Sequence, residues 1–367
     1  MSSLESNPVS IACVVGARPN FMKIAPIMEQ LARDPRFHAR LIHTGQHFSP
    51  EMSDAFFRDL AMPRPDEYLG IPPGSQTEQT ACMMRALEAS FLQSRPHLVV
   101  VVGDVTSTLA AALVASKLEI PLAHVEAGLR SFDRRMPEEI NRLVTDTLSD
   151  YLFVSEPSGL DNLRTEGVAA GRVFFVGNVM IDSLLRFRDR AMLSGALERL
   201  QVASKEYALV TLHRPSNVDD PEQLRRVAGL LERVAQKMPV VFPIHPRTRQ
   251  RMLDAGIATA GLVLTPPLGY LDFLRLMADC RFVLTDSGGI QEETTVLGVP
   301  CLTLRENTER PITIEQGTNR LVGLDPTAAY AAVEDLLSNG LPPGRIPELW
   351  DGRASERIVE VLKQKLM

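Results

Sequence analysis

The sequence has few of the features that mark several common protein classes. Its 367 residues carry 39 Lys and Arg against 45 Asp and Glu, and only 5% of them are aromatic. It therefore lacks the basic surface and the stacking side chains that a nucleic-acid-binding protein needs. No apolar run approaches the roughly 18 residues that span a membrane. We expect neither nucleic acid nor a membrane as a partner.

Three nucleotide-binding and metal-binding motifs are also absent from the sequence. No two of the 23 glycines are separated by a single residue, so GxGxxG does not occur, and neither does GxxxxGK[ST]. HExxH is missing as well, and His43 and His47 flank the expected end of a strand rather than lying on a helix. These absences argue against a standard dinucleotide dehydrogenase and a P-loop kinase, and we expect no metal site.

Cysteines are few and scattered. Cys13, Cys82, Cys280 and Cys301 form no CxxC pair and have no histidine at metal-ligand spacing, so we expect reduced thiols. The first ten residues, MSSLESNPVS, lack the basic and apolar regions of a signal peptide. Both features favour a cytoplasmic protein.

What the sequence does have is a regular alternation of short β-rich runs and longer helical patterns. This alternation is typical of an α/β fold with parallel sheets. The length suggests two domains, and we place their boundary near residues 180–205. Residues 354–367 have the pattern of an amphipathic helix that can dock on either domain.

One loop combines the features of a phosphate-binding site. Thr285–Glu293, which reads TDSGGIQEE, follows the expected strand Phe282–Thr285 and opens a helix. Paired glycines let backbone N–H groups approach a phosphate, and a helix N-terminus carries about half a positive charge. The loop indicates an anion site; the alternative is that Ser287 only caps the helix and the two glutamates only favour its first turn.

A second loop of this kind, GARPN, follows the expected strand Ile11–Val15. Arg18 and Lys23 are its candidate partners for a phosphate. The alternative for Arg18 is a solvated surface position.

Three carboxylates are expected where strands or their loops end, at the sheet edge where ligands bind in such folds. They are Asp104 in VGDVT, Glu126 in HVEAG and Glu138 in PEE. Carboxylates clustered in one cleft raise each other's pKa and can transfer protons near neutral pH. The alternatives are a helix cap for Asp104 and a charge in the first turn of a helix for Glu138.

Two histidines end neighbouring strands expected in the second half of the chain, His213 in HRP and His245 in HPR. A single histidine in such a place usually forms only local hydrogen bonds, but each of these has an arginine within two residues. Arg305 and Arg310 follow the expected strand Cys301–Leu304 and add positive charge. This convergence favours a diphosphate ligand.

Seven segments occur in a characteristic order between residue 11 and about residue 323: GARPNFMKIAP, TGQH, HVEAGLRS, MPEEINR, TLHRPSN, PIHPRT and TDSGGIQEE…GVPCLTLRENTERP. In order and spacing they resemble the non-hydrolysing UDP-N-acetylglucosamine 2-epimerases. The resemblance implies the GT-B fold, which is an α/β fold of two Rossmann-like domains with a cleft between them. The N-terminal domain would span residues 1–180, with the helix 354–367 packing back on it, and the UDP-binding domain would span residues 181–353.

The resemblance also implies a role for each candidate residue. The acid/base group would be Asp104, Glu126, Glu138 and His213, with Lys23 close by. The diphosphate would lie on Ser287, Gly288 and Gly289, and the ribose hydroxyls on Glu293. Arg18, His245 and Arg310 would surround the phosphates and the sugar. A UDP-sugar would be the substrate, the assembly a homodimer, and no metal or other cofactor would be required.

The implied reaction inverts C2 of UDP-N-acetylglucosamine by eliminating UDP and adding it back through a glycal. We expect the two domains to close over the substrate and to bring Glu138 and His213 together. The sequence departs from the family at one motif, where HRxEN reads HRPSN. The segment SFDRRMPEEINR is also similar to family members that act on UDP-linked diacetamido-uronic acids. The alternatives are a 2-epimerase of such an acid, a hydrolysing 2-epimerase, a GT-B glycosyltransferase and a nucleotide-sugar-binding protein without activity.

Overall fold

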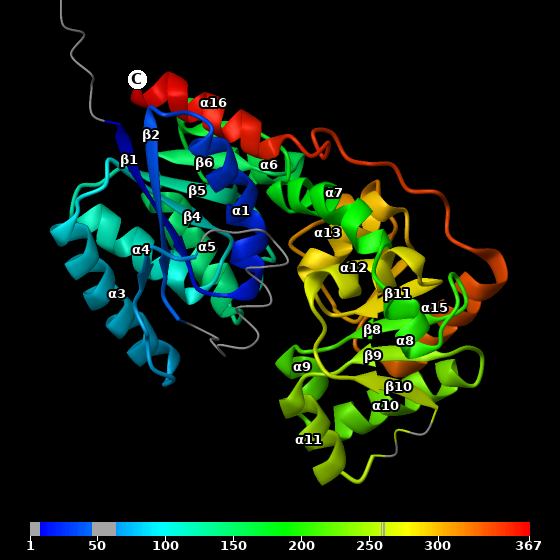
Figure 1. The fold of residues 1–367 in the computed structure, drawn as a ribbon. Coiled ribbons are helices and arrows are strands. Elements are labelled where there is room, and N and C mark those ends of the chain that lie inside the picture. The colour runs from blue at the N-terminus through cyan, green and yellow to red at the C-terminus, as the bar shows by residue number, and fades with distance from the viewer. Residues whose placement is uncertain (1–7, 46–63, 258, 260) are drawn as a thin grey trace, which may run out of the picture. The chain divides into compact units, whose positions relative to one another are not determined.

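The computed structural model describes residues 8–45, 64–257, 259 and 261–367 (Figure 1). Their contacts divide the chain into two compact units, which we call unit 1 (Met1–Ser183 and Glu348–Met367) and unit 2 (Leu184–Pro347). In each unit a parallel sheet is flanked by helices. The fold is therefore α/β with two Rossmann-like domains, as the sequence predicts.

The sheet of unit 1 has the strand order β3-β2-β1-β4-β5-β6-β7, and every pairing in it is parallel. Its strands are β1 (Val9–Val15), β2 (Phe37–His43), β3 (Glu67–Tyr68), β4 (Leu98–Val102), β5 (Leu122–Ala127), β6 (Tyr151–Val154) and β7 (Val173–Phe175). The helical elements of unit 1 are α1 (Arg18–Ala32), α3 (Gln76–Gln93), α4 (Thr106–Lys117), α5 (Pro137–Leu148), α6 (Pro157–Thr165), η1 (Ala170–Arg172) and α16 (Ala354–Leu366), and α7 (Val179–Met192) runs on into unit 2.

The sheet of unit 2 has the order β10-β9-β8-β11-β12-β13 and is also parallel. Its strands are β8 (Ala208–Thr211), β9 (Val240–Pro243), β10 (Leu262–Thr265), β11 (Phe282–Thr285), β12 (Cys301–Thr303) and β13 (Asn319–Leu321). Its helices are α8 (Ala196–Leu200), α9 (Pro215–Val218), α10 (Pro221–Ala235), α11 (Pro246–Asp254), α12 (Tyr270–Asp279), α13 (Gly288–Leu297), α14 (Ile312–Glu315) and α15 (Pro326–Asn339).

The central strands show why these segments form parallel sheets. Strand β4 reads LVVVV, and all five of its residues are buried. A continuous run of β-branched residues suits a strand that is covered on both faces, as parallel strands are. The helices α3 and α4 contribute apolar side chains to the same core, among them Met83 and Ala111.

Each sheet reverses its strand order at one place. In unit 1 the chain runs outward from β1 to β2 and β3 and resumes at β4 on the other side of β1. In unit 2 it does the same between β8 and β11. Ligands of open α/β sheets bind at such switch points, beyond the carboxyl ends of the strands. The loop after β1 lies close to the start of α4 there. A Cβ on Gly16 would be only 2.4 Å from Ser107 Oγ.

The C-terminal helix belongs to unit 1, where α16 packs against α1 (Figure 1). The buried Asp182 holds its N-terminus by accepting hydrogen bonds from the Ala354 N–H (3.0 Å), the Ser355 N–H (2.7 Å) and the Ser355 hydroxyl (2.6 Å). This capping ties two segments that are 172 residues apart in the chain.

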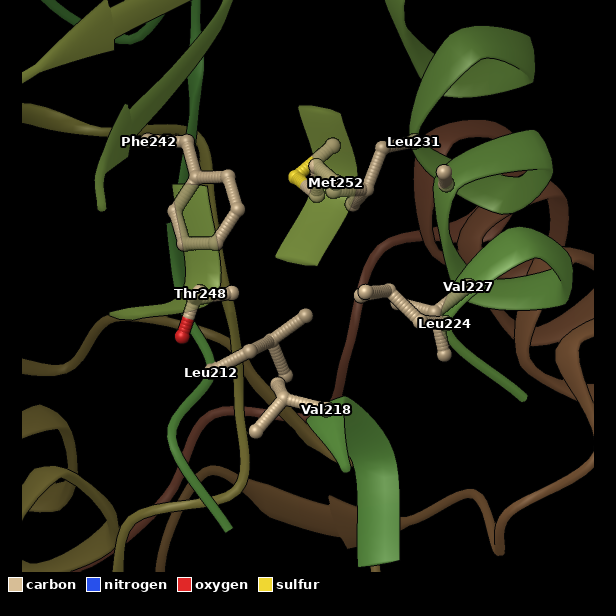
Figure 2. Close-up of a pocket in the computed structure, with 9 residues that line it drawn as sticks. Leu212, Val218, Leu224, Val227, Leu231, Phe242, Thr248 and Met252 are labelled. Atoms are coloured by element: carbon tan, nitrogen blue, oxygen red, sulfur yellow. The ribbon is translucent and has the colours of Figure 1, made fainter. Parts of the chain in front are cut away.

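Unit 2 has a small apolar cavity in its core (Figure 2). It lies among β-sheet and helix side chains, with Phe242 on one side and Leu224, Val227 and Leu231 of α10 on the other. Thr248 is the polar residue in its lining. We regard it as a packing feature of the core. Among the described residues, no helix has both the length and the apolar character that a membrane span requires.

Candidate active site

Lys23 and Glu126 form an ion pair at the switch point of unit 1. Lys23 lies in the second turn of α1. Glu126 lies near the end of β5, which extends two residues beyond the strand Leu122–Val125 expected from the sequence. The Lys23 Nζ contacts Glu126 Oε2, and both residues are buried. An adjacent ammonium favours the ionised form of a carboxylate, which is the form that can act as a base.

Arg142 of α5 joins this pair to a second carboxylate. Its Nη2 lies 2.6 Å from Asp104 Oδ2 and 3.5 Å from Glu126 Oε1, and its Nη1 donates to the Glu126 carbonyl at 3.2 Å. Asn141 donates to the Asp104 carbonyl at 2.7 Å. We call Lys23, Asp104, Glu126 and Arg142 the unit 1 cluster. Its two cations, Lys23 and Arg142, offset the repulsion between the Asp104 and Glu126 carboxylates.

The backbone around this cluster adopts unusual conformations. Glu126 has φ +71°, a left-handed value that costs a non-glycine residue about 1–2 kcal/mol. Gly103, with φ +68°, packs where a Cβ would lie 3.2 Å from Lys23 Nζ. Asn20 braces the neighbouring loop, since its Oδ1 accepts from the Ala17 N–H at 3.0 Å and its Nδ2 donates to the Val102 carbonyl at 3.0 Å. Strain of this kind is typical of functional sites.

The alternatives for two carboxylates can be compared with the structure. Asp104 does not cap α4, whose N-cap position is Val105. Glu138 does lie in the first turn of α5, after Pro137, and is half-buried. Its neighbour Glu139 is the buried one, and it accepts from the Ser131 N–H at 2.8 Å.

In unit 2 the switch point is occupied by Asp286 and the loop that begins at His213. Asp286 is fully buried and accepts from the backbone N–H of His213 (3.0 Å) and of Arg214 (2.9 Å) and from Asn217 Nδ2 (3.1 Å). Its Oδ1 also lies 3.0 Å from His213 Nδ1. Burial alone would raise the pKa of Asp286, but the His213 hydrogen bond and charge lower it below its ordinary value.

His213 is thus oriented by a buried carboxylate. Its side chain is 58% exposed, and its Nδ1 is held by Asp286, so the Nε2 edge of the ring faces solvent. An imidazole held in this way at a sheet edge can take up or deliver a proton.

The N-terminus of α13 has the features of a site for an anion. Ser287 is its N-cap residue and, within the part of the chain that the structure describes, makes no side-chain capping hydrogen bond. Arg310 lies directly over Gly288, where a Cβ would be 2.6 Å from Arg310 Nη1. We call Ser287, Gly288, Gly289 and Arg310 the unit 2 cradle. Backbone N–H groups and a guanidinium together suit a phosphate.

A buried carboxylate holds the arginines of this region. Glu309 accepts from Arg305 at 2.8 and 2.9 Å, and it lies 3.5 Å from Arg310 Nη1 and 3.7 Å from Arg214 Nη2. Burial would raise the pKa of Glu309, but these guanidinium groups hold it well below its usual range. The Nε of Arg310 also lies 2.7 Å from Glu292, so the two glutamates keep the guanidinium in place.

Glu293 is buried on the same helix and accepts a hydrogen bond from the Tyr270 hydroxyl at 2.8 Å. Burial raises the pKa of Glu293 from 4.5 to about 7, and the neighbouring Glu292 contributes in the same direction. Burial also raises the pKa of Tyr270 well above its ordinary value. Glu293 is therefore a carboxyl group that titrates near neutral pH.

The structure gives less evidence for two other predicted residues, His245 and Arg18. His245 is the N-cap of α11, and its Nδ1 accepts from the Arg247 N–H at 3.2 Å, which is the local bond of the alternative interpretation. Arg18 begins α1, but its side chain lies outside the described residues, as do Gln46 and His47 of the TGQH motif. Ligand contacts of Arg18 and His245 stay predictions.

The structure thus brings Lys23, Asp104 and Glu126 together in unit 1, and in unit 2 it places His213 against Asp286, which directly precedes Ser287. The meeting of Glu138 in unit 1 and His213 in unit 2 stays a prediction. Three organising residues received no role from the sequence: Arg142, Asp286 and Glu309. All three lie inside the quoted motifs MPEEINR, TDSGG and RENTERP, and the available signal was a charged residue within four positions of an assigned one.

Comparison with known proteins gives consistent results along the chain. A family profile described as UDP-N-acetylglucosamine 2-epimerase matches residues 29–363. A protein of Methanocaldococcus jannaschii named UDP-N-acetylglucosamine 2-epimerase is 41% identical over 364 residues, which cover 96% of this chain and 99% of the relative. A protein of Pseudomonas aeruginosa named UDP-2,3-diacetamido-2,3-dideoxy-D-glucuronate 2-epimerase is 40% identical over 359 residues, covering 96% and 99%.

Solved structures are also similar to this chain. The crystal structure of Methanocaldococcus jannaschii UDP-GlcNAc 2-epimerase in complex with UDP-GlcNAc and UDP superposes with a TM-score of 0.91 at 40% identity, over 97% of this chain and 99% of that one. A UDP-glucosyltransferase from Polygonum tinctorium superposes with a TM-score of 0.61 at 17% identity, over 98% of this chain and 99% of that one, a likeness of fold alone.

Proposed function

The chain belongs to the UDP-N-acetylglucosamine 2-epimerase family, and from that membership we propose that it converts UDP-N-acetylglucosamine to UDP-N-acetylmannosamine by inverting C2. The observation that carries the proposal is the unit 1 cluster, in which two carboxylates and two cations meet at a switch point; Lys23, Glu126 and Arg142 are buried, and the Asp104 side chain is 23% exposed. Such a cluster can exchange protons with a sugar carbon. A protein that only binds nucleotides would not need it.

The chemistry follows from the substrate. The hydrogen on C2 has no carbonyl beside it, so a carboxylate cannot remove it directly. Loss of UDP breaks the C1–O bond, with the electron pair leaving on the diphosphate, and the ring becomes oxocarbenium-like. A base then takes the C2 proton, and the C1–C2 double bond of a glycal forms. Addition of UDP back to C1, with a proton delivered to the other face of C2, gives the epimer.

Each step has a proposed group. The diphosphate leaves with negative charge, which the backbone N–H groups at the start of α13 and the Arg310 guanidinium would stabilise. Proton transfer on the two faces of C2 needs separate acid/base groups. We assign proton transfer to Asp104, Glu126, Glu138 and His213, the diphosphate to Ser287, Gly288, Gly289 and Arg310, the ribose to Glu293, and the remaining phosphate and sugar contacts to Arg18, Lys23 and His245.

A second candidate substrate is a UDP-linked 2,3-diacetamido-2,3-dideoxy-glucuronic acid. It is favoured by the Pseudomonas aeruginosa relative, which is 40% identical to this chain, while the Methanocaldococcus jannaschii relative is 41% identical. The reaction at C2 would be the same, with different groups on C3 and C6 of the sugar.

Product analysis tests the proposal. The protein is incubated with each UDP-sugar separately, and the products are identified by ¹H NMR and by chromatography of free UDP. A UDP-linked manno product from UDP-N-acetylglucosamine supports the first candidate, and a manno product from the diacetamido-uronic acid alone supports the second. Free N-acetylmannosamine with free UDP would show a hydrolysing enzyme, and unchanged substrate in both samples would overturn the epimerase assignment.

We further propose that the enzyme works in the cytoplasm as a homodimer. The cytoplasmic location is supported by its four free thiols, three of them buried. The homodimer rests on the family resemblance, and light scattering of the purified protein measures it: a mass near twice 40.5 kDa is expected, and a monomer would contradict it.

A further inference from the structure

His124 is a fully buried histidine whose two ring nitrogens both face acceptors. It lies on β5, two residues before Glu126. Its Nδ1 is 2.6 Å from Asp146 Oδ1 of α5, and its Nε2 is 2.8 Å from the Gly103 carbonyl at the end of β4. Neither the catalytic assignment nor the sequence motifs gave this residue a role.

The chemistry of these partners determines how many protons the ring carries. A backbone carbonyl can only accept, so the Nε2 must donate to Gly103. Asp146 is also an acceptor: its Oδ2 receives the Gly128 N–H at 3.1 Å and lies 2.7 Å from Arg130 Nη1. The Arg130 guanidinium and the Gly128 N–H favour the ionised form of Asp146. Either neutral tautomer would place a nitrogen lone pair against an oxygen at less than 3 Å.

From this geometry we propose that His124 is an imidazolium, protonated on both ring nitrogens, and acts as the positioning residue for Asp104 and Glu126. The inference rests on the proposed function, in which those two carboxylates transfer protons at C2. His124 does not touch the substrate, since its side chain has no exposed surface.

The hydrogen bonds of the imidazolium reach the backbone on either side of the unit 1 cluster. Gly103 directly precedes Asp104, and its carbonyl is held by the Nε2–H. Gly128 follows Glu126 by two residues, and its N–H is held by the same Asp146 that receives the Nδ1–H. One buried ion pair thus fixes both strand ends that carry the carboxylates.

Those strand ends need such support. Gly103, Glu126 and Gly128 all have positive φ, at +68°, +71° and +80°. For Glu126 that conformation is unfavourable and persists only where the surroundings impose it. Without the His124 contacts, β4 and β5 would keep their pairing, but the carboxylates at their ends would lose their fixed separation.

The charges around the ring explain how a buried imidazolium is tolerated. Asp146 carries the neutralising charge, Arg130 shares that carboxylate, and Arg130 in turn makes two hydrogen bonds to Glu166, at 2.7 and 2.8 Å. The two cations and two carboxylates balance. A buried ion pair of this kind contributes specificity of arrangement more than stability.

NMR of the ¹⁵N-histidine-labelled wild-type protein tests the protonation state directly. At pH 7.5 we expect one histidine with two slowly exchanging ring N–H signals, which persist when each of the other six histidines is replaced in turn. A His124 ring with a single protonated nitrogen would overturn the proposal. This measurement does not depend on whether any variant folds.

Turnover tests the positioning role. His124→Asn is expected to lower kcat about 10- to 100-fold, as loss of a supporting contact does, with KM and the Kd for UDP changed less than twofold. Asp146→Asn should lower kcat similarly and remove one of the His124 ring N–H signals. His38→Asn, an exposed histidine on β2, is the control and should leave kcat unchanged.

The outcomes separate this inference from the proposed function. A wild-type protein that leaves both UDP-sugars unchanged refutes the epimerase assignment, whatever the His124 spectrum shows. An active wild-type protein whose His124→Asn variant is folded and keeps wild-type kcat refutes the positioning role alone.

Discussion

At the scale of single residues, the proposed chemistry depends on ionisable side chains that are held in pairs. Lys23 contacts Glu126, Arg142 contacts Asp104, and Asp286 contacts His213. Breaking the buried Lys23–Glu126 pair leaves an uncompensated buried charge, which costs far more than an exposed salt bridge contributes. Each pair is also directional, since it aims a particular oxygen or nitrogen.

The His213–Asp286 contact leads to a first prediction. Asp286→Asn keeps the size of the side chain but replaces an acceptor oxygen by an amide, which cannot receive the His213 Nδ1–H and both backbone N–H groups. We expect kcat to fall about 10- to 100-fold because the imidazole is no longer held. Steady-state kinetics measures this, with Asp254→Asn on the exposed end of α11 as the control. Wild-type turnover in Asp286→Asn would mean that His213 needs no orientation.

The raised pKa of Glu293 leads to a second prediction. A carboxylate accepts hydrogen bonds from ribose hydroxyls better than a carboxylic acid does, and the pKa of about 7 means that Glu293 ionises as the pH rises from 6 to 8. The Kd for UDP should therefore decrease about tenfold over that range. Calorimetry at several pH values measures it.

The control for this effect is Glu293→Gln, which cannot ionise. Its Kd should lack the tenfold change, and equal pH dependence in the variant and the wild type would remove Glu293 from the ribose assignment. The sign for stability is opposite: because the folded pKa lies above the ordinary 4.5, the stability that Glu293 contributes is present below pH 4.5 and is lost as the pH rises through about 7.

Residue types at strand ends could be predicted from the sequence, whereas their partners could not. Asp104, Glu126 and His213 follow recognisable β-rich runs, and parallel strands end at a common edge. The partner of Asp104 is Arg142, 38 residues away, and the partner of His213 is Asp286, 73 residues away. Such contacts depend on which strands are neighbours, and that order follows from the whole sheet.

At the scale of elements, the proposed anion site depends on the start of α13. The helix has ten residues, begins at Gly288 beside the end of β11, and stops at Gly298, whose φ of +67° is the left-handed conformation typical of a helix C-terminus. Its N-terminal N–H groups are thus oriented by a helix with a defined beginning and end. Arg310 reaches it from the loop before α14.

Gly288→Ala is the third prediction. The added Cβ would lie 2.6 Å from Arg310 Nη1, so the guanidinium must shift from the position in which Glu292 and Glu309 hold it, and the unit 2 cradle loses its cation. We expect the Kd for UDP to rise at least tenfold, about 1.4 kcal/mol. Gly229→Ala in α10, where nothing lies within 4 Å of the new Cβ, is the matched control and should bind UDP normally. Unchanged UDP affinity in Gly288→Ala would contradict the cradle.

Many helix and strand identities were readable because central β-rich runs such as β4 and β11 are short and buried, and helices such as α10 and α12 are amphipathic. The ends were less readable. Glu126 was expected just beyond its strand, but β5 continues to Ala127 and includes it. The sequence does not show that a residue with a left-handed φ lies inside the strand. Glu138 was compatible with a loop or a helix, and Pro137 at the first position of α5 decides for the helix.

At the scale of the whole molecule, the proposed functions are divided between two units. Proton transfer is assigned mainly to unit 1, and the diphosphate and ribose are assigned to unit 2. Each set lies at the switch point of its own sheet, between β1 and β4 or between β8 and β11. The two Rossmann-like folds thus present different chemistry at equivalent positions.

This division gives the fourth prediction. Asp104→Asn and Glu126→Gln should each lower kcat about 10²-fold or more, the usual range for a lost acid or base, while the Kd for UDP stays within twofold of wild type. The control is Glu88→Gln on the exposed face of α3. Loss of UDP affinity in either unit 1 variant, measured by calorimetry, would show that the functions are not divided in this way.

The central claim is that C2 of a UDP-sugar is deprotonated and reprotonated within the enzyme, and solvent exchange measures it most directly. UDP-N-acetylglucosamine is incubated with the protein in D₂O and followed by ¹H NMR until the gluco and manno forms reach equilibrium. The account predicts that deuterium replaces the C2 hydrogen in the manno form and in the gluco form that returns from it, with the sugar still attached to UDP. A manno product that keeps its C2 hydrogen would contradict the account.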